Sequence, residues 1–249
     1  MGGTTRTERT DGHGRLGSAL SGLAVAVGCL LFLGGFVWGA LVYQPYTVPT
    51  DSMTPTVMSG DRVLAQRIDG ADVRRGDVVV FTDTDWANAP MIKRVVGIGG
   101  DTIACCDADG RLTVNGTPVE EPYLRHQGWG GGKTASPTGF SATVPDGHLF
   151  LLGDQRGSSQ DSRVHLKEPG QGSVPRSTVT GRVDAVVWPF GGLVDRPQGF
   201  AALPGGISRP GPAEPLAWAV AGGAALILGG AAYGPLAKLL GRSRARRRT

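Results

Sequence analysis

The chain has little charge and little cysteine. Only 18% of its 249 residues are Asp, Glu, Lys or Arg. Its three cysteines are too few for a disulfide framework, and none has the CxxC spacing that is typical of zinc ligands. The sequence therefore predicts no metal site, and it implies no cofactor. The neighbouring Cys105 and Cys106 favour two unpaired thiols over a strained vicinal disulfide.

Turn-forming residues are abundant instead. The 41 glycines and 17 prolines accompany short runs of β-branched and aromatic residues, which favours β structure over a helical bundle. Turn signals such as Asn115-Gly116 separate these runs and indicate hairpins. We therefore predict a mainly β fold for the middle of the chain, with strands at residues 61–66, 77–81, 92–98, 111–114, 148–152 and 182–188.

Two segments are apolar and long enough to cross a bilayer. Residues 18–43 carry no charge, and the 24 residues from Leu20 to Tyr43 would extend about 36 Å as a helix, against a hydrocarbon core of about 30 Å. A cleavable secretory signal is the alternative, but its apolar region usually has only about 7–15 residues. The second segment, residues 216–238, is uncharged up to Lys238. We predict a transmembrane helix in each segment.

Basic residues flank both predicted spans. The polar tail 1–17 has a slight positive excess, and six basic residues with no acidic one lie from Lys238 onward, mostly in the tail 239–249. Such a tail could bind nucleic acid or acidic lipid, but Lys and Arg beside a span usually remain cytoplasmic. We expect a plasma-membrane protein with both termini in the cytoplasm and no nucleic-acid partner. Residues 44–200 are then an extracytoplasmic β domain, and residues 201–215 a Gly/Pro linker.

Two residues of this domain are suited to nucleophilic catalysis. Ser52 lies between Pro49 and Pro55, which keep the backbone stiff and non-helical, although a serine in such a loop is more often structural. Lys93 lies in an apolar run, where burial would lower its pKa and make it a general base. A strand lysine that extends to water is the commoner arrangement.

A third segment, residues 153–163, follows a predicted strand and carries charges of both signs. Its carboxylates and guanidiniums could form planar bidentate pairs that hold the loop in one conformation, Asp154 with Arg156 and Asp161 with Arg163. Taken alone, such a segment is more typical of a solvated turn.

Together the motifs resemble those of bacterial type I signal peptidases, peptidase family S26. These are membrane-anchored serine proteases with a signal-peptidase/LexA-like β-rich domain, which remove signal peptides from exported preproteins. The resemblance extends from residue 44 to residue 195, and the additional carboxy-terminal span is typical of some Gram-positive members. It rests on VPTDSMTPTV at 48–57, RRGDVVVF at 74–81, IKRVVGIGGD at 92–101, NGTPVEEPYL at 115–124, GDQRGSSQDSR at 153–163 and VPRSTVTGRVDAVVWP at 174–189.

The resemblance implies a serine–lysine dyad, with Ser52 as nucleophile and Lys93 as general base. Thr50, where other members have serine, and the Ser52 amide would form the oxyanion hole, and Ser159 would orient the lysine. Asp161 with Arg163, together with Asp154 and Arg156, would support the site. The shallow pockets for small residues at substrate positions −1 and −3, the A-x-A preference, would be lined by Val48, Met53, Val57 and Ile92. Expected partners are signal peptides, the lipid bilayer and a nearby export translocon.

The sequence departs from the family pattern at a few positions outside the dyad. Gln155 replaces the usual asparagine, Val57 a usual leucine, and Gly99-Gly100 a usual Pro-Gly. The aromatic residues that usually follow Arg163 in the family are replaced here by VHLKEPGQGS. The positions of this loop therefore cannot be matched to those of the family.

Other functions fit the sequence less well. A Ser–His mechanism would use His126, His148 or His165, but none of them lies in a motif that requires it. A repressor-type Ser–Lys autoprotease would carry a DNA-binding domain instead of two spans. An aspartic lipoprotein peptidase needs aspartates within its spans, and neither span has one. The alternative from another class is a catalytically inactive, membrane-tethered β-rich binding module.

Overall fold

A computed structural model describes residues 12–124, 134–189 and 191–246, with side chains described from residue 17 to residue 235 outside the two internal gaps. Two compact units are present, Leu41–Ala213 and a helical unit formed by the two ends of the chain. Most of the predicted amino-terminal tail, part of the Gly-rich loop with His126, and the last three residues lie outside the described residues.

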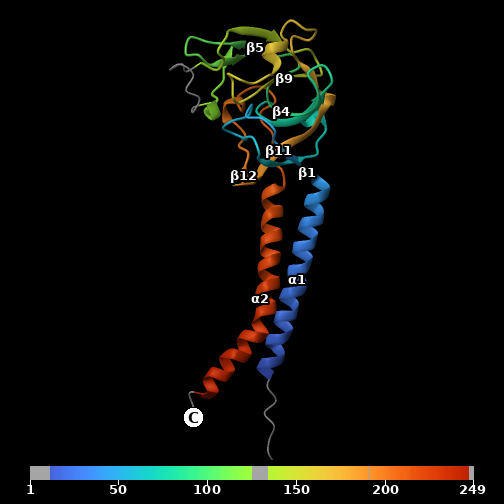
Figure 1. Ribbon diagram of the computed structural model, residues 1–249, viewed down its shortest axis with the longest axis vertical. Helices are drawn as coiled ribbons and strands as arrows, with labels where there is room; N and C mark the ends of the chain where they lie inside the picture. The colour runs from blue at the N-terminus through green and yellow to red at the C-terminus, as the bar shows by residue number, and fades with distance from the viewer. Residues whose placement is uncertain (1–11, 125–133, 190, 247–249) are drawn as a thin grey trace, which may run out of the picture. The chain divides into compact units, whose positions relative to one another are not determined.

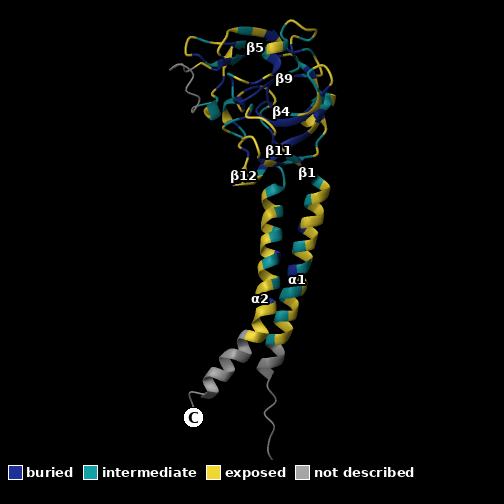
Figure 2. Ribbon diagram, in the orientation of Figure 1, coloured by how far each residue is buried: buried dark blue, intermediate teal, exposed yellow. Residues whose placement is uncertain are grey.

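The helical unit contains the two apolar helices (Figure 1). Helix α1 is Gly12–Val42 and α2 is Ala213–Arg246. Each has a stretch long and apolar enough to cross a membrane, Gly17–Val42 and Ala213–Pro235. Both helices start earlier than the predicted spans. Helix α1 also ends one residue earlier, because Tyr43 begins the first strand. Most of their apolar side chains are exposed (Figure 2).

The Leu41–Ala213 unit is built from two antiparallel sheets, and the prediction of a mainly β fold is confirmed. The larger sheet has the order β1 (Tyr43–Thr47), β2 (Arg62–Gln66), β11 (Val179–Trp188), β3 (Val78–Asp83), β4 (Ala87–Ile98), β9 (His148–Leu152) and β10 (Val174–Pro175), and β12 (Gly192–Leu193) pairs with β11. The smaller sheet has the order β7 (Thr117–Pro118), β6 (Leu112–Val114), β5 (Thr102–Cys105) and β8 (Phe140–Thr143). Short 3-10 helices lie at Gly70–Asp72, Pro122–Leu124, Ser162–His165, Arg176–Thr178 and Gln198–Phe200.

All six predicted runs correspond to strands, and the Asn115-Gly116 turn joins β6 to β7. Asn115 and Gly116 have φ values of 53° and 77°, the left-handed conformation that two-residue hairpin turns need. Three substantial strands were not predicted. Strand β1 contains a proline and directly follows the helix, and β5 and β8 are only four residues long.

Two sequence-based expectations differ from the structure in this unit. Cys105 and Cys106 are joined as a disulfide instead of being two unpaired thiols. The predicted linker begins with a segment that is packed on the domain. Leu203 of this segment is buried in the same apolar cluster as Phe200, and Ser208 Oγ donates to Asp77 Oδ2 at 2.6 Å. Arg75 also donates to the Pro204 carbonyl at 2.6 Å, so the first part of this Gly/Pro-rich segment lies against the domain.

Candidate active site

Ser52 lies in a closed loop between β1 and β2. Val48 N–H donates to the Asp61 carbonyl at 2.9 Å, and Gly60 N–H donates to the Val48 carbonyl at 2.8 Å, which closes the base of the loop. Within it, Thr54 N–H donates to the Asp51 carbonyl and Val57 N–H to the Met53 carbonyl, each at 3.0 Å, so one turn contains the serine and a second follows it. Two side chains of the loop, Met53 and Val57, are buried in an apolar cluster with residues of the neighbouring strands. These contacts hold Ser52, which is half-buried, in place at the edge of a cleft.

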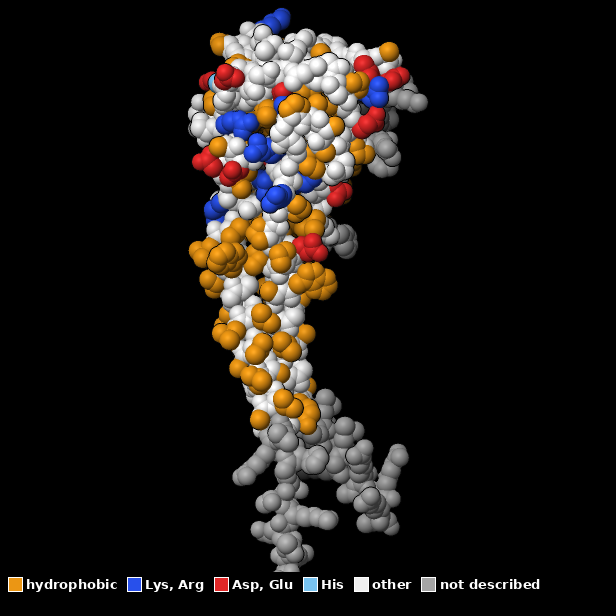
Figure 3. Space-filling model, turned by 180° about the vertical axis from the view of Figure 1, so that it is seen from behind, with side chains coloured by type: hydrophobic (Ala, Val, Ile, Leu, Met, Phe, Trp, Pro, Cys, Tyr) orange, Lys and Arg blue, Asp and Glu red, His pale blue; other side chains and the backbone are white. Residues whose placement is uncertain are grey.

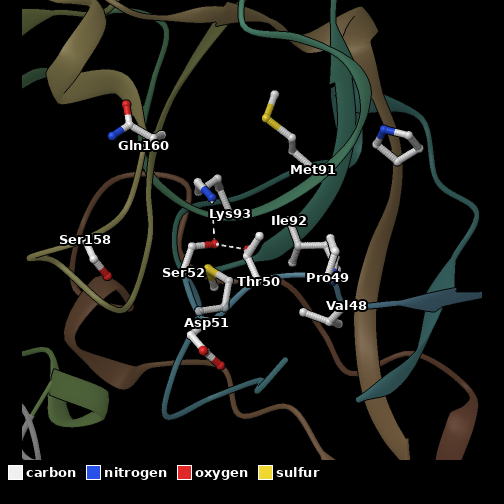
Figure 4. Close-up of a pocket in the computed structure, with 12 residues that line it drawn as sticks. Val48, Pro49, Thr50, Asp51, Ser52, Met91, Ile92, Lys93, Ser158 and Gln160 are labelled. Atoms are coloured by element: carbon white, nitrogen blue, oxygen red, sulfur yellow. Dashed lines mark hydrogen bonds between the residues drawn. The ribbon is translucent and has the colours of Figure 1, made fainter. Parts of the chain in front are cut away.

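Lys93 approaches Ser52 from strand β4. This strand pairs with β3 on one side and β9 on the other, and Lys93 lies opposite Val79 of β3. The Lys93 side chain is buried, with 5% of the residue exposed. Its Nζ lies 2.8 Å from Ser52 Oγ, across 41 residues of sequence (Figure 4). The structure therefore brings together the two residues that were predicted to form the dyad.

Burial controls the charge of Lys93. It lowers the pKa of the lysine from the ordinary 10.5, because the ammonium loses hydration, and the negative charges of Asp161 and Asp154 oppose this only in part. A lowered pKa increases the fraction of neutral amine near neutral pH. The neutral amine has a lone pair that can accept the Ser52 hydroxyl proton, as a general base must.

Thr50 adds a second hydroxyl beside the nucleophile. Its Oγ1 lies 3.3 Å from Ser52 Oγ, and both side chains border the same cleft (Figure 4). This is a long hydrogen bond, so the hydroxyl can turn to another acceptor at little cost. Thr50 therefore lies near the atom that reacts, within reach of an oxygen bound beside Ser52.

The loop 153–163 contacts the serine loop through its backbone. Gln155 N–H donates to the Ser52 carbonyl at 3.0 Å. Gly153 allows this approach, since a Cβ at that position would lie 2.5 Å from the same carbonyl oxygen and closer still to Ser159 Oγ. Asp161 pairs with Arg163 through two hydrogen bonds of 2.8 and 2.7 Å, and it also accepts from Gly153 N–H at 3.0 Å. The predicted Asp161–Arg163 pair is thus present and holds the loop at Gly153.

Ser159 is buried, but its Oγ has no hydrogen-bond partner among the residues that the structure describes. The expected hydrogen bond from Ser159 to Lys93 is therefore not formed in this structure, where Lys93 Nζ bonds to Ser52. A buried hydroxyl without a partner is costly. Its orienting role stays a prediction.

A buried arginine next to the dyad lysine supports both loops. Arg94 donates to the two carboxylate oxygens of Asp154 at 2.8 and 2.7 Å, and to the Gly76 carbonyl at 2.8 Å. Thr56 of the serine loop donates to Asp154 as well. Burial disfavours the charge on Arg94, but Asp154 outweighs it and raises the pKa of the guanidinium. Asp154 therefore ties the serine loop to β4.

The predicted bidentate pairing of Asp154 with Arg156 requires correction. Arg94 is the bidentate partner of Asp154, and Arg156 forms a buried ion pair with Glu121. Arg156 also donates to the Gly153 carbonyl at 3.1 Å. Residues two apart in a loop were the nearest candidates in sequence, but in the folded chain each charge has another buried partner, Arg94 for Asp154 and Glu121 for Arg156. Sequence reasoning missed Arg94 and Glu121, although Arg94 directly follows the predicted base.

A cleft of about 270 Å³ adjoins the dyad. Three of the four predicted specificity residues line it, namely Val48, Met53 and Ile92. Val57 is not among the lining residues, and its side chain is fully buried in the same apolar cluster as Met53. Six further residues that were not assigned to the substrate site also line the cleft: Pro49, Asp51, Pro90, Met91, Ser158 and Gln160.

The described histidines are engaged elsewhere. His148 contacts the Asp146 carbonyl at 2.9 Å, and His165 contacts Glu168 at 2.8 Å while its ring stacks on Trp86. Neither forms a hydrogen bond with Ser52 within the described part of the chain. Across that same part, no three His, Cys, Asp or Glu residues are grouped as metal ligands.

Comparisons with known proteins point to one family. The family described as "Signal peptidase, peptidase S26" matches residues 20–188. The probable signal peptidase I of Mycobacterium leprae is 32% identical over 207 residues, which cover 62% of this chain and 71% of that protein. Signal peptidase I of Bacillus licheniformis is 34% identical over 160 residues, which cover 61% of this chain and 80% of that protein. A crystal structure of a signal peptidase I from Enterococcus faecalis is 29% identical with a TM-score of 0.35, and covers 44% of this chain and 94% of that one.

Proposed function

Because the chain belongs to the signal peptidase family, peptidase S26, we propose that Ser52 and Lys93 are its nucleophile and general base. The chain is a serine peptidase that cleaves signal peptides from preproteins. The assignment of the two residues rests on one observation, the 2.8 Å distance between Lys93 Nζ and Ser52 Oγ at a buried lysine.

The geometry supports acylation in two proton transfers. Neutral Lys93 accepts the hydroxyl proton of Ser52 as Oγ attacks the scissile carbonyl carbon, which gives a tetrahedral intermediate with a negatively charged oxygen. The intermediate collapses by breaking the C–N bond, and the Lys93 ammonium donates its proton to the departing amine. The signal peptide remains as an ester on Ser52. A water molecule, deprotonated by Lys93, then hydrolyses this ester and restores both residues.

Thr50 and the Ser52 amide are proposed as the donors to the oxyanion. The Thr50 hydroxyl lies beside Ser52 Oγ, so it can turn to the oxygen that becomes negative during attack. Donors placed where charge develops stabilise the transition state more than the substrate. Ser159 is proposed to form a hydrogen bond with Lys93 when the lysine moves away from Ser52. Its buried Oγ has no other hydrogen-bond partner among the described residues.

The cleft supports a preference for small residues before the cleaved bond. Its walls near Ser52 include the apolar side chains of Val48, Met53 and Ile92, and we propose that they accept an alanine-sized group and reject a larger one. We propose cleavage after A-x-A-type sequences on this basis. The substrate segment would lie along β4, whose Pro90, Met91 and Ile92 border the same cleft.

We propose that α1 and α2 anchor the protein in the plasma membrane with both chain ends in the cytoplasm. On the face seen in Figure 3, hydrophobic side chains lie along much of the described length of the helices, and each helix contains a stretch apolar enough to cross a membrane. The basic residues flank the outer ends of the helices in the sequence, which supports this orientation. Signal peptides would then meet the domain at the extracytoplasmic surface, near the bilayer and an export translocon.

A cleavage assay tests the function. A preprotein with an A-x-A site is incubated with the full chain in liposomes, and the product is identified by amino-terminal sequencing. We expect one cut after the second alanine by wild type and none by Ser52→Ala. Binding of the preprotein without a cut by wild type would favour the inactive binding module.

A further inference from the structure

Helices α1 and α2 approach each other closely at two glycines, Gly28 of α1 and Gly223 of α2. A Cβ atom on Gly28 would lie 2.8 Å from the carbonyl oxygen of Gly223. The reverse also holds, since a Cβ on Gly223 would lie 2.7 Å from the carbonyl oxygen of Gly28 and 2.5 Å from the amide nitrogen of Phe32. These atoms belong to the backbone and cannot move aside as a flexible side chain can. Only glycine fits at either position with the helices this close.

The same register continues along both helices. Ser21 Oγ donates to the Gly230 carbonyl at 2.8 Å, and a Cβ on Gly230 would lie 3.0 Å from the Ser21 carbonyl oxygen. Toward the other end, a Cβ on Gly35 would meet Val220 at 3.1 Å. Positions on α2 fall as positions on α1 rise, so the helices are antiparallel. The small residues are seven positions apart on each helix, the repeat that keeps one face against a partner helix.

Other glycines of these helices show that the close contacts are not a consequence of composition. Gly22 and Gly34 of α1, and Gly222 and Gly229 of α2, are open positions, where a Cβ would meet nothing within 4 Å. Each of them directly precedes or follows, in the sequence, a position that is in contact. The two helices therefore use one glycine-containing face each and leave the other free.

We propose that Ser21, Gly28 and Gly35 of α1 and Gly223 and Gly230 of α2 form an intramolecular docking seam within the membrane. The second span is then a specific partner of the first, in addition to being an anchor. Lipid tails are as apolar as leucine, so helices in a bilayer associate through close backbone packing and hydrogen bonds between them. The seam provides both. The proposal rests on the membrane localisation proposed above and is independent of the catalytic assignment.

An engineered disulfide tests the register without disturbing the closest approach. A Cβ on Gly35 would lie 3.4 Å from the Ala219 Cβ, close to the separation of about 3.5–4.5 Å usual in disulfides. The full chain carries Gly35→Cys with Ala219→Cys, in a background of Cys29→Ala, Cys105→Ser and Cys106→Ser, and is oxidised in native membranes. We expect a disulfide by peptide mass spectrometry. The matched control is Gly34→Cys with Ala219→Cys, which should remain reduced.

The variant with Gly35→Cys and Ala219→Cys then serves as a disulfide reporter. Leucine substitutions in this reporter test the seam itself. Gly28→Leu and Gly223→Leu should lower the disulfide yield to that of the Gly34→Cys control. Their matched controls, Gly22→Leu and Gly222→Leu, should retain the reporter's yield, because the added side chains point to open space. The proposal would be overturned if Gly222→Leu and Gly223→Leu lowered the disulfide yield equally, or if both retained the reporter's yield.

Alkaline extraction of the same membranes separates the two proposals. A chain that stays in the membrane but forms no Gly35–Ala219 reporter disulfide would overturn the seam alone. A chain released by alkali would overturn the membrane localisation and the seam with it. Cleavage of a preprotein, measured on the same samples, reports on the dyad separately.

Discussion

Lys93 and Arg94 are neighbours on β4, and both are buried, but their environments have opposite effects on their charge. Lys93 directs Nζ to the Ser52 hydroxyl at 2.8 Å, and burial lowers its pKa. Arg94 directs its guanidinium to Asp154, and the pKa of Arg94 is raised. Alternation along the strand separates the two side chains. One strand thus holds a base that can be neutral next to a cation that remains charged.

The Arg94–Asp154 pair predicts a large loss of stability when one partner is removed. Arg94→Met leaves a carboxylate that is 0% exposed without its main counter-charge, and breaking such a buried pair costs about 3–5 kcal/mol. Chemical denaturation of the full chain in detergent measures this loss in the free energy of unfolding. Adding Asp154→Leu should recover part of the loss. A double variant no more stable than Arg94→Met would contradict this account of the pair.

Thr50 should affect the chemical step more than substrate binding. Thr50→Val keeps the shape but removes the hydroxyl, and loss of one oxyanion donor lowers kcat by about 10²–10³-fold. KM should change little, because the donor acts on charge that develops only during attack. Thr50→Ser serves as the matched control and should retain most of the activity. Equal activity of the serine and valine variants in preprotein cleavage would rule out a donor role.

Gly153→Ala should disrupt the contact between the two loops of the site. The added methyl would lie 2.5 Å from the Ser52 carbonyl oxygen, so the two loops must move apart, and we expect this to displace Ser52 from Lys93. Misplacement of a nucleophile by about 1 Å costs on the order of 100-fold in rate. Gly192→Ala is the control, since a Cβ there meets nothing within 4 Å. If kcat/KM of Gly153→Ala equals that of the control, the close approach has no role in catalysis.

The segment after residue 197 should contribute to domain stability. Phe200 is fully buried, and its ring lies 3.2 Å from where a Cβ on Gly76 would be. Phe200→Ala should therefore cost about 3–5 kcal/mol in the free energy of unfolding. Leu193→Ala, at a side chain with 53% of the residue exposed, should stay within about 0.5 kcal/mol of wild type. A similarly small effect for Phe200→Ala would contradict a contribution of this residue to the stability of the domain.

Local sequence patterns predicted six of the strands and the two apolar helices, because these depend on periodicity and composition. The proximity of Ser52 and Lys93 was expected from motifs in a family order, since spacing alone cannot bring residues 41 apart together. Partners in ion pairs were harder to predict. Asp154 pairs with a residue 60 positions away, and nothing near it in the sequence indicates which buried cation it meets. The loop motif also does not reveal which side chains reach the cleft, since Met53 and Val57 are equally buried and only Met53 lines it.

The most direct test of the account is the pH dependence of preprotein cleavage by wild type and by Lys93→Met. If neutral Lys93 is the base, kcat/KM of wild type rises with pH and levels off above the pKa of Lys93. That pKa lies below the ordinary 10.5, because burial lowers it. Lys93→Met should lose activity by on the order of 10⁴-fold at every pH. A wild-type profile that rises only at or above 10.5, or a Lys93→Met variant that keeps its activity, would contradict the central claim.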